Sequence, residues 1–240
     1  MSGTAACGSA LRALITHALM ERCLACGAAL TCAGDCRVPV CAACRSRLEV
    51  ITGRRCLTCS RQLMSETNRC TRCRNRDYAF ASNTSLLAYT GATRRLLYHY
   101  KFRARTRLAD LFACALHTAG LVDGDSHVIP VPARPRRPLQ RTSTRFDQTG
   151  LIARSLRRRT GCTVHHALRR SSGPPQKRLD YDARSRNVAG RIRPAAARPL
   201  PARVILLDDV FTTGATAHEC ALVLARCGVR ETRVVTVALG

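Results

Sequence analysis

The chain has 240 residues, with 40 Lys or Arg against 15 Asp or Glu, so its formal net charge at pH 7 is +25. This length allows one sizeable α/β core and a small additional unit, and no apolar run reaches the roughly 18 residues of a membrane-spanning helix. We therefore expect no membrane insertion, and the charge favours polyanionic ligands or partners, although Arg-rich surfaces also arise without a ligand.

The N-terminus carries an amphipathic stretch whose apolar face is formed by Leu11, Leu14, Ile15, Ala18 and Leu19. Arg12 and His17 interrupt it and no basic segment precedes it, so it is a poor signal peptide. A cytoplasmic location is the resulting expectation.

Eleven of the fifteen cysteines lie within residues 1–80, and eight of them form four consecutive CxxC pairs. The pairs are Cys23 and Cys26, Cys41 and Cys44, Cys56 and Cys59, and Cys70 and Cys73. Two residues between thiols let one tight turn present both sulfurs to a tetrahedral metal, and a second such turn completes the site. In a reducing compartment the pattern predicts two structural zinc sites rather than a disulfide framework.

Cys32 and Cys36 belong to no CxxC pair, and we expect them to be bystanders of the first site. A redox or disulfide cluster is the alternative, and a metal-dependent redox protein is the weakest of three functional hypotheses. Because the composition changes near residue 80, we expect a double zinc-ribbon domain with the amphipathic helix over 1–80 and a second domain over 81–240.

The second domain reads as alternating helices and strands. Helices are predicted over 93–102, 107–120, 146–159 and 215–227, and strands over 127–132, 163–168, 204–209 and 232–239, of which 163–168 is the weakest. Such alternation predicts an α/β fold with a mainly parallel sheet flanked by helices.

The sequence VILLDDVFTTGAT (204–216) stands out as a strand, a turn and a helix start. Asp208 and Asp209 follow the apolar strand at its carboxyl end, where ligands of parallel sheets bind. A turn with hydroxyls, exposed amides and a helix N-terminus comes next, formed by Thr212, Thr213, Gly214, Ala215 and Thr216. A diol beside a phosphate, as in ribose 5-phosphate, fits this order; an ordinary capped strand-to-helix loop is the alternative.

VILLDDVFTTGAT resembles the ribose-phosphate motif of type I phosphoribosyltransferases. With the CxxC-rich head and the sequences VIPVP (128–132), GPPQKRL (173–179) and RNVAG (186–190), nearly the whole chain resembles the ComF family, which is linked to competence and DNA uptake. The resemblance implies a type I phosphoribosyltransferase fold, with Asp208 and Asp209 facing the ribose hydroxyls and residues 212–216 around the 5-phosphate of phosphoribosyl pyrophosphate.

The resemblance also implies that the loop after VIPVP holds pyrophosphate and that the segment near 171–193 is a mobile cover. These segments carry Arg134, Arg136 and Arg137, then Lys177, Arg178, Arg184 and Arg186, whose charges suit a diphosphate or a solvated linker. Residues 144–148 read TRFDQ, where family members usually read RGFNQ.

Two leading functions follow. The first is a phosphoribosyltransferase that uses Mg²⁺ to bridge pyrophosphate, with an unknown acceptor and no assignable general base. The second is a non-catalytic factor that binds single-stranded DNA or DNA-uptake and recombination proteins. The nine Arg against one Asp in residues 134–159 support the second function, whereas the absence of Trp and the ten Tyr and Phe oppose it.

Overall fold

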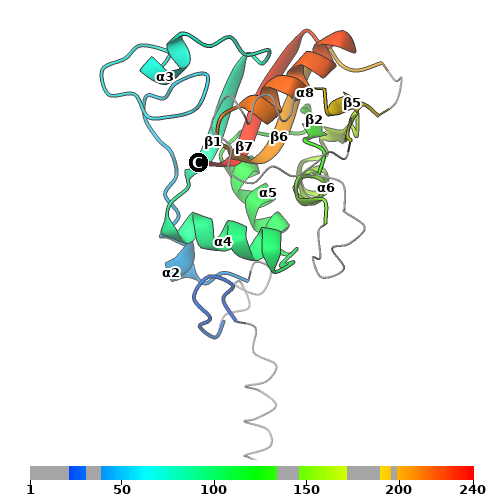
Figure 1. Cartoon of the computed structure of the whole chain (residues 1–240). Helices are drawn as coiled ribbons and strands as arrows, with labels where there is room; N and C mark the ends of the chain where they lie inside the picture. The colour runs from blue at the N-terminus through cyan, green and yellow to red at the C-terminus, as the bar shows by residue number, and fades with distance from the viewer. Residues whose placement is uncertain (1–21, 31–38, 134–145, 172–189, 196–198) are drawn as a thin grey trace, which may run out of the picture. The chain divides into compact units, whose positions relative to one another are not determined.

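The computed structural model describes residues 22–30, 39–133, 146–171, 190–195 and 199–240 (Figure 1). Contacts within the chain divide it into two compact units, Met1–Arg47 and Leu48–Gly240. The first contains the short helix α2 (Ala42–Arg45), and the second begins before the third CxxC pair. The boundary near residue 80 stays a prediction, and the amphipathic stretch 11–19 lies outside the described residues.

A five-stranded parallel sheet forms the centre of the larger unit. Its order is β1 (Ser82–Ala88), β7 (Glu231–Leu239), β6 (Arg203–Phe211), β2 (His127–Pro130) and β3 (Thr163–Val164). The middle strands are nearly continuous apolar runs because helices cover both of their faces, as parallel sheets require. Leu206, Leu207, Ile129 and Val237 are fully buried.

The longer described helices are α4 (Gly91–Phe102) and α5 (Leu108–Thr118) between β1 and β2, α6 (Gln148–Thr160) after β2, and α8 (Ala215–Arg226) after β6. Helix α5 packs on α6, and α6 contacts β2, β3 and β6, whereas α8 contacts β6, β7 and β5 (Ile192–Pro194). Strand β5 pairs antiparallel with β4 (Leu168–Arg170) in a separate ribbon. A further short helix, α3 (Thr71–Arg74), carries part of the fourth CxxC pair.

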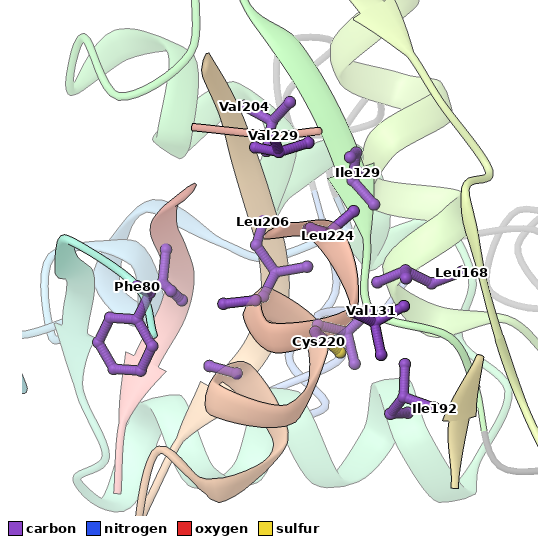
Figure 2. Packing of buried hydrophobic residues seen from close by; sticks show 14 of the residues in the cluster. Phe80, Ile129, Val131, Leu168, Ile192, Val204, Leu206, Cys220, Leu224 and Val229 are labelled. Carbon is purple, nitrogen blue, oxygen red and sulfur yellow. The ribbon is translucent and has the colours of Figure 1, made fainter. Parts of the chain in front are cut away.

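An apolar cluster of the described residues lies between the sheet and α8 (Figure 2). Leu206 of β6 and Ile129 of β2 meet Cys220 and Leu224 of α8, and Leu168 from the small ribbon closes the side. Each fully buried aliphatic side chain stabilises the fold by about 1.5–3 kcal/mol. This packing fixes the direction in which α8 leaves the end of β6.

The predicted fold class is confirmed, and the long predicted elements are present within a few residues. Helices α5 and α8 are followed by Gly120 and Gly228, which adopt φ angles of +67° and +89°, as helix-ending glycines do. The strand predicted over 163–168 is wrong beyond Val164, because Leu168 already belongs to the β4–β5 ribbon. Among the described residues, no helix combines the length and apolarity needed to cross a membrane.

Candidate functional site

The strand order places a crevice at the carboxyl ends of β6 and β2. From β6 the chain passes through α8 to β7 on one side, and from β2 it passes through α6 to β3 on the other. Right-handed crossovers in opposite directions place α8 and α6 on opposite faces, so the loops after β6 and β2 diverge. Open parallel sheets bind ligands at such a switch point.

Asp208 and Asp209 lie inside β6 near its carboxyl end, and both are partly exposed. Successive side chains of a strand point to opposite faces, and the two carboxylates accordingly have different partners. Asp209 Oδ1 lies 2.8 Å from Lys101 Nζ of α4, whereas Asp208 Oδ1 accepts a 2.8 Å hydrogen bond from the Asp209 amide. Lys101 was not among the predicted site residues, because its partner is 108 residues away in sequence.

The pKa of Asp208 is raised from 3.8 to about 7. Burial is the main cause, and the negative charge of Asp209 adds to it; the Asp209 amide and the charges of Lys101 and Arg170 act in the opposite direction. The crevice thus holds one carboxylate neutralised by a lysine and one that exchanges its proton near neutral pH. A cation or a pair of hydroxyls would stabilise the ionised form of Asp208.

The turn that follows β6 depends on Gly214. Its φ of +78° is left-handed, and a Cβ at this position would lie 2.9 Å from both Phe211 Cζ and Tyr78 Cε1. Helix α8 begins at the next residue, so its first amides, which have no intrahelical partner, face the end of β6. The hydroxyl of Thr213 accepts one of them, from Ala215, at 3.3 Å. Residues 212–216 thus present the start of a helix, where unpaired amides and the helix dipole favour negative charge.

Tyr78 holds this turn in place, although it was not among the site residues predicted from the sequence. Its hydroxyl donates a 3.0 Å hydrogen bond to the Thr213 carbonyl, and its ring stacks on Phe80 at a centroid distance of 4.9 Å. The amide of the next residue, Ala79, donates to His218 Nδ1 of α8 at 3.0 Å. The segment that leaves the fourth CxxC pair therefore fixes both the turn and the first turns of α8.

A hollow of the surface adjoins the same turn. Its rim includes Thr212, Thr213 and three arginines from the region of the third and fourth CxxC pairs: Arg61, Arg72 and Arg76. These arginines were not predicted as site residues, because nothing in the spacing of the cysteines indicates which face of the cluster meets the sheet. Their charge adds to the anion preference of the α8 N-terminus.

The other side of the crevice is built by β2 and the start of α6. Thr149 donates from its hydroxyl to the Val131 carbonyl at 2.6 Å, and Asp147 caps α6 by accepting from the Gly150 amide at 3.0 Å. A carboxylate is a good N-cap, which accounts physically for Asp at position 147 where family members usually carry Asn. Tyr100 donates to the Gln148 carbonyl at 2.6 Å and ties α4 to the same helix start.

The remaining predicted anion ligands fall outside the described residues. These are Arg134, Arg136 and Arg137 after β2, and Lys177, Arg178, Arg184 and Arg186 in the segment before β5. The segment is described again from Gly190, whose amide lies 3.4 Å from Glu219 Oε2 of α8. Among the predicted ligands of the phosphoribosyl group, the structure therefore brings together those of β6 and the following turn.

The eight predicted cysteine ligands form two groups of four. In each group all four sulfurs lie within 4.8 Å of one another and could hold a metal ion. The first group is Cys23, Cys26, Cys41 and Cys44, and the second is Cys56, Cys59, Cys70 and Cys73. The Cys26 and Cys41 sulfurs are 3.8 Å apart, and those of Cys59 and Cys70 are 3.7 Å apart. Four sulfurs at about 2.3 Å from a tetrahedral zinc have nearly this spacing, so the residues fit zinc.

The backbone around each group prepares one thiol for metal binding. Burial raises the pKa of Cys23, but hydrogen bonds from the backbone of Cys41, Cys26 and Ala25 outweigh it and lower the pKa to about 6. Cys56 behaves in the same way, with a pKa of about 7. Each group thus presents one ready thiolate, the form that binds metal. Cys32 and Cys36 lie outside the described residues.

Sequence comparison finds similar proteins, although no family model matches the chain. The competence protein ComFC of Bacillus subtilis is 29% identical over 79% of this chain and 79% of its own length. The DNA utilization protein YhgH of Salmonella typhi is 27% identical over 69% of this chain and 75% of its own.

Two solved structures resemble the chain more distantly. One is the allosteric regulatory enzyme of purine biosynthesis, with a TM-score of 0.38 and 17% identity over 58% of this chain, which spans only 29% of that enzyme. The other is an adenine phosphoribosyltransferase, with a TM-score of 0.33 and 16% identity over 56% of this chain and 68% of its own. At such scores neither informs the choice of ligand. The similarity to ComFC and YhgH over most of the chain confirms the resemblance to the ComF family that the sequence motifs predicted.

Proposed function

We propose that the chain binds a 5-phosphoribosyl group, as carried by phosphoribosyl pyrophosphate, at Asp208, Asp209 and residues 212–216. The observation that carries the proposal is the left-handed turn at Gly214, which begins α8 directly after two carboxylates at the switch point of the sheet. Phosphate would accept from the amides of the α8 N-terminus. The carboxylates would accept from the ribose hydroxyls.

Charge balance supports the same ligand. Lys101 already neutralises Asp209, and the arginines of the hollow, Arg61, Arg72 and Arg76, adjoin Thr212 and Thr213. The predicted pyrophosphate loop follows β2, the strand beside β6 in the sheet. Arg134, Arg136 and Arg137 in that loop, and Lys177 and Arg178 in the predicted cover, remain proposed ligands of the diphosphate.

Mg²⁺ belongs to the proposal as the partner of the diphosphate. Bound there, Mg²⁺ would neutralise phosphate oxygens and stabilise a leaving diphosphate. The carboxylates of Asp208 and Asp209 supply the hard oxygen atoms that Mg²⁺ prefers, directly or through water. Transfer to an acceptor is a separate step, for which no general base is assigned.

The metal in both cysteine groups is proposed to be zinc, in a structural role. The four cysteine sulfurs of each group would occupy all four positions of a tetrahedral zinc, which would leave no open position for a substrate. Every described cysteine is a free thiol rather than part of a disulfide, and this agrees with the reducing, cytoplasmic location that we propose.

Calorimetry with phosphoribosyl pyrophosphate and Mg²⁺ tests the binding proposal. Wild-type protein should bind, and Asp208→Asn/Asp209→Asn should lose most of the affinity. Asp125→Asn in the exposed segment before β2 is the control, since it removes one carboxylate at the opposite end of the sheet. Absence of wild-type binding would refute the proposal, and pyrophosphate release with candidate bases would show transfer.

A second proposed function is the binding of single-stranded nucleic acid. The net charge of +25 suits a polyanion, and the curated relatives are named for competence and DNA utilization. DNA-uptake or recombination proteins are the corresponding protein partners. The two functions are compatible, because a phosphoribosyl site at the carboxyl end of β6 leaves the outer surfaces of the helices available for nucleic acid.

A further inference from the structure

Helix α4 exposes two aromatic rings to solvent. The exposed fraction is 48% for Tyr98 and 63% for Phe102, among the highest for large apolar side chains in the described part of the chain. The two residues are four positions apart and share one face of the helix. Their ring centroids are 5.3 Å apart, so they form one continuous apolar surface. In a chain with only ten Tyr and Phe and no Trp, two adjacent exposed rings are a notable share.

Packing does not require these rings. The buried side of α4 is formed by Thr93, Leu96, Leu97 and Tyr100, all of which are almost inaccessible. Tyr100 packs edge-to-face on Phe112 of α5 at 5.4 Å and thus attaches the helix to the body. The stability of α4 therefore rests on the opposite face, and the exposed pair has no role in the core.

Positive charge surrounds the pair. Residues 91–107 contain six Lys or Arg, and no Asp or Glu stands between Asp77 and Asp110. Arg94 lies one turn before Tyr98 on the same face, and Arg103 and Arg105 follow the helix; all three are exposed. Burial lowers the pKa of His99, and the nearby charges of Arg105, Arg103 and Arg95 lower it further.

The exposed rings and the arginines around them together indicate which kind of partner this face of α4 binds. A second copy of the chain would bring the same arginines against this face at a net charge of +25, so like charges would oppose pairing. A single-stranded nucleic acid offers the complementary set, because its bases have apolar faces and its phosphates pair with guanidinium groups. A duplex hides its base faces in the stack and would meet only the charges.

We propose that the α4 stripe, Arg94, Tyr98, Phe102, Arg103 and Arg105, is a platform for single-stranded nucleic acid. Bases stack on Tyr98 and Phe102, and the arginines contact the flanking phosphates. The inference rests on the second proposed function and locates it on the chain. Lys101, the neighbour of Phe102, already reaches Asp209, so the platform adjoins the carboxyl end of β6.

Fluorescence anisotropy with a labelled thymidine oligonucleotide of about 20 nucleotides tests the platform on the full chain. Tyr98→Ala/Phe102→Ala should weaken binding tenfold or more and leave the salt dependence unchanged. Arg94→Gln/Arg105→Gln should instead reduce the slope of log K against log salt by about 1.4. Met64→Ala, which removes an 86% exposed apolar side chain elsewhere, is the control and should bind as wild type.

Each contrary result has a separate meaning. If wild-type protein binds and the aromatic double variant binds equally well, the platform is refuted while nucleic-acid binding stands. If wild-type protein does not bind even at low salt, the second proposed function fails and the platform with it. Equal affinity for a duplex of the same length would also overturn the platform. The same holds if Tyr98→Ala/Phe102→Ala changes only the oligomeric state or the binding of vesicles. Circular dichroism and zinc content should be unchanged in all variants.

Discussion

Asp208→Asn is expected to stabilise the ligand-free fold at neutral pH while weakening phosphoribosyl binding. In the folded chain burial and the charge of Asp209 raise the pKa of Asp208 from 3.8 to about 7. A carboxyl whose pKa is raised by folding favours the folded state fully below pH 3.8. That contribution is lost as the pH rises through about 7. Asparagine has the same shape and carries no charge, so it avoids this loss.

The magnitude follows from the two pKa values. At about 1.4 kcal/mol per pH unit, the difference between 3.8 and about 7 corresponds to roughly 4 kcal/mol. About two of the roughly three pH units of this shift lie above pH 5, so about 2–3 kcal/mol of the gain should appear between pH 5 and pH 7.5. This gain equals the stability that the wild-type chain loses because it carries a carboxylate at the carboxyl end of β6.

Urea unfolding of wild type and Asp208→Asn at pH 5 and pH 7.5 measures the effect, and comparing the variants at each pH cancels the titration of the cysteine groups. Asp209→Asn is the matched control with the opposite sign. It leaves the partly buried Lys101 without its 2.8 Å partner and should destabilise the fold at pH 7.5. A stability difference between Asp208→Asn and wild type that does not grow with pH would refute the reasoning.

Three further predictions concern the turn and the metal. Gly214→Ala should lower the free energy of unfolding by about 1–2 kcal/mol, because the left-handed φ disfavours a Cβ and the added carbon lies 2.9 Å from two aromatic rings; unfolding curves and calorimetry should both change. Tyr78→Phe should weaken phosphoribosyl binding severalfold with unchanged zinc content, because it removes the 3.0 Å hydrogen bond to Thr213 and keeps the ring; unchanged affinity would contradict a positioning role. Cys56→Ser/Cys70→Ser should reduce bound zinc from two equivalents to one and destabilise the larger unit; elemental analysis still giving two equivalents would contradict the assignment.

The fold was predictable where one local pattern decides the structure. The apolar run that ends in DDVFTTGAT and the glycines after α5 and α8 each specify an element by short-range chemistry. Strand β1 was not predicted, because its sequence, SNTSLLA, is half polar. Several of its polar groups pair with residues distant in sequence: the Ser85 and Thr236 hydroxyls are 2.7 Å apart, and Ser60 donates to the Asn83 carbonyl at 2.7 Å. The β4–β5 ribbon was missed for the same reason.

The site shows the same division between local and distant causes. The order of carboxylates, turn and helix start is contiguous in sequence, so its geometry could be expected from strand and helix rules. The other side chains that contact the site come from distant parts of the sequence: Lys101 from α4, Tyr78 from the segment after the fourth CxxC pair, and the arginines of the hollow. Tyr78 follows Cys73 by five residues and holds the turn that begins α8. Loss of metal from this cysteine group should therefore displace the segment that carries Tyr78 and, with it, the turn at residues 212–216. The cysteine group therefore acts as a support of the site, and its sequence distance from DDVFTTGAT gives no indication of that role.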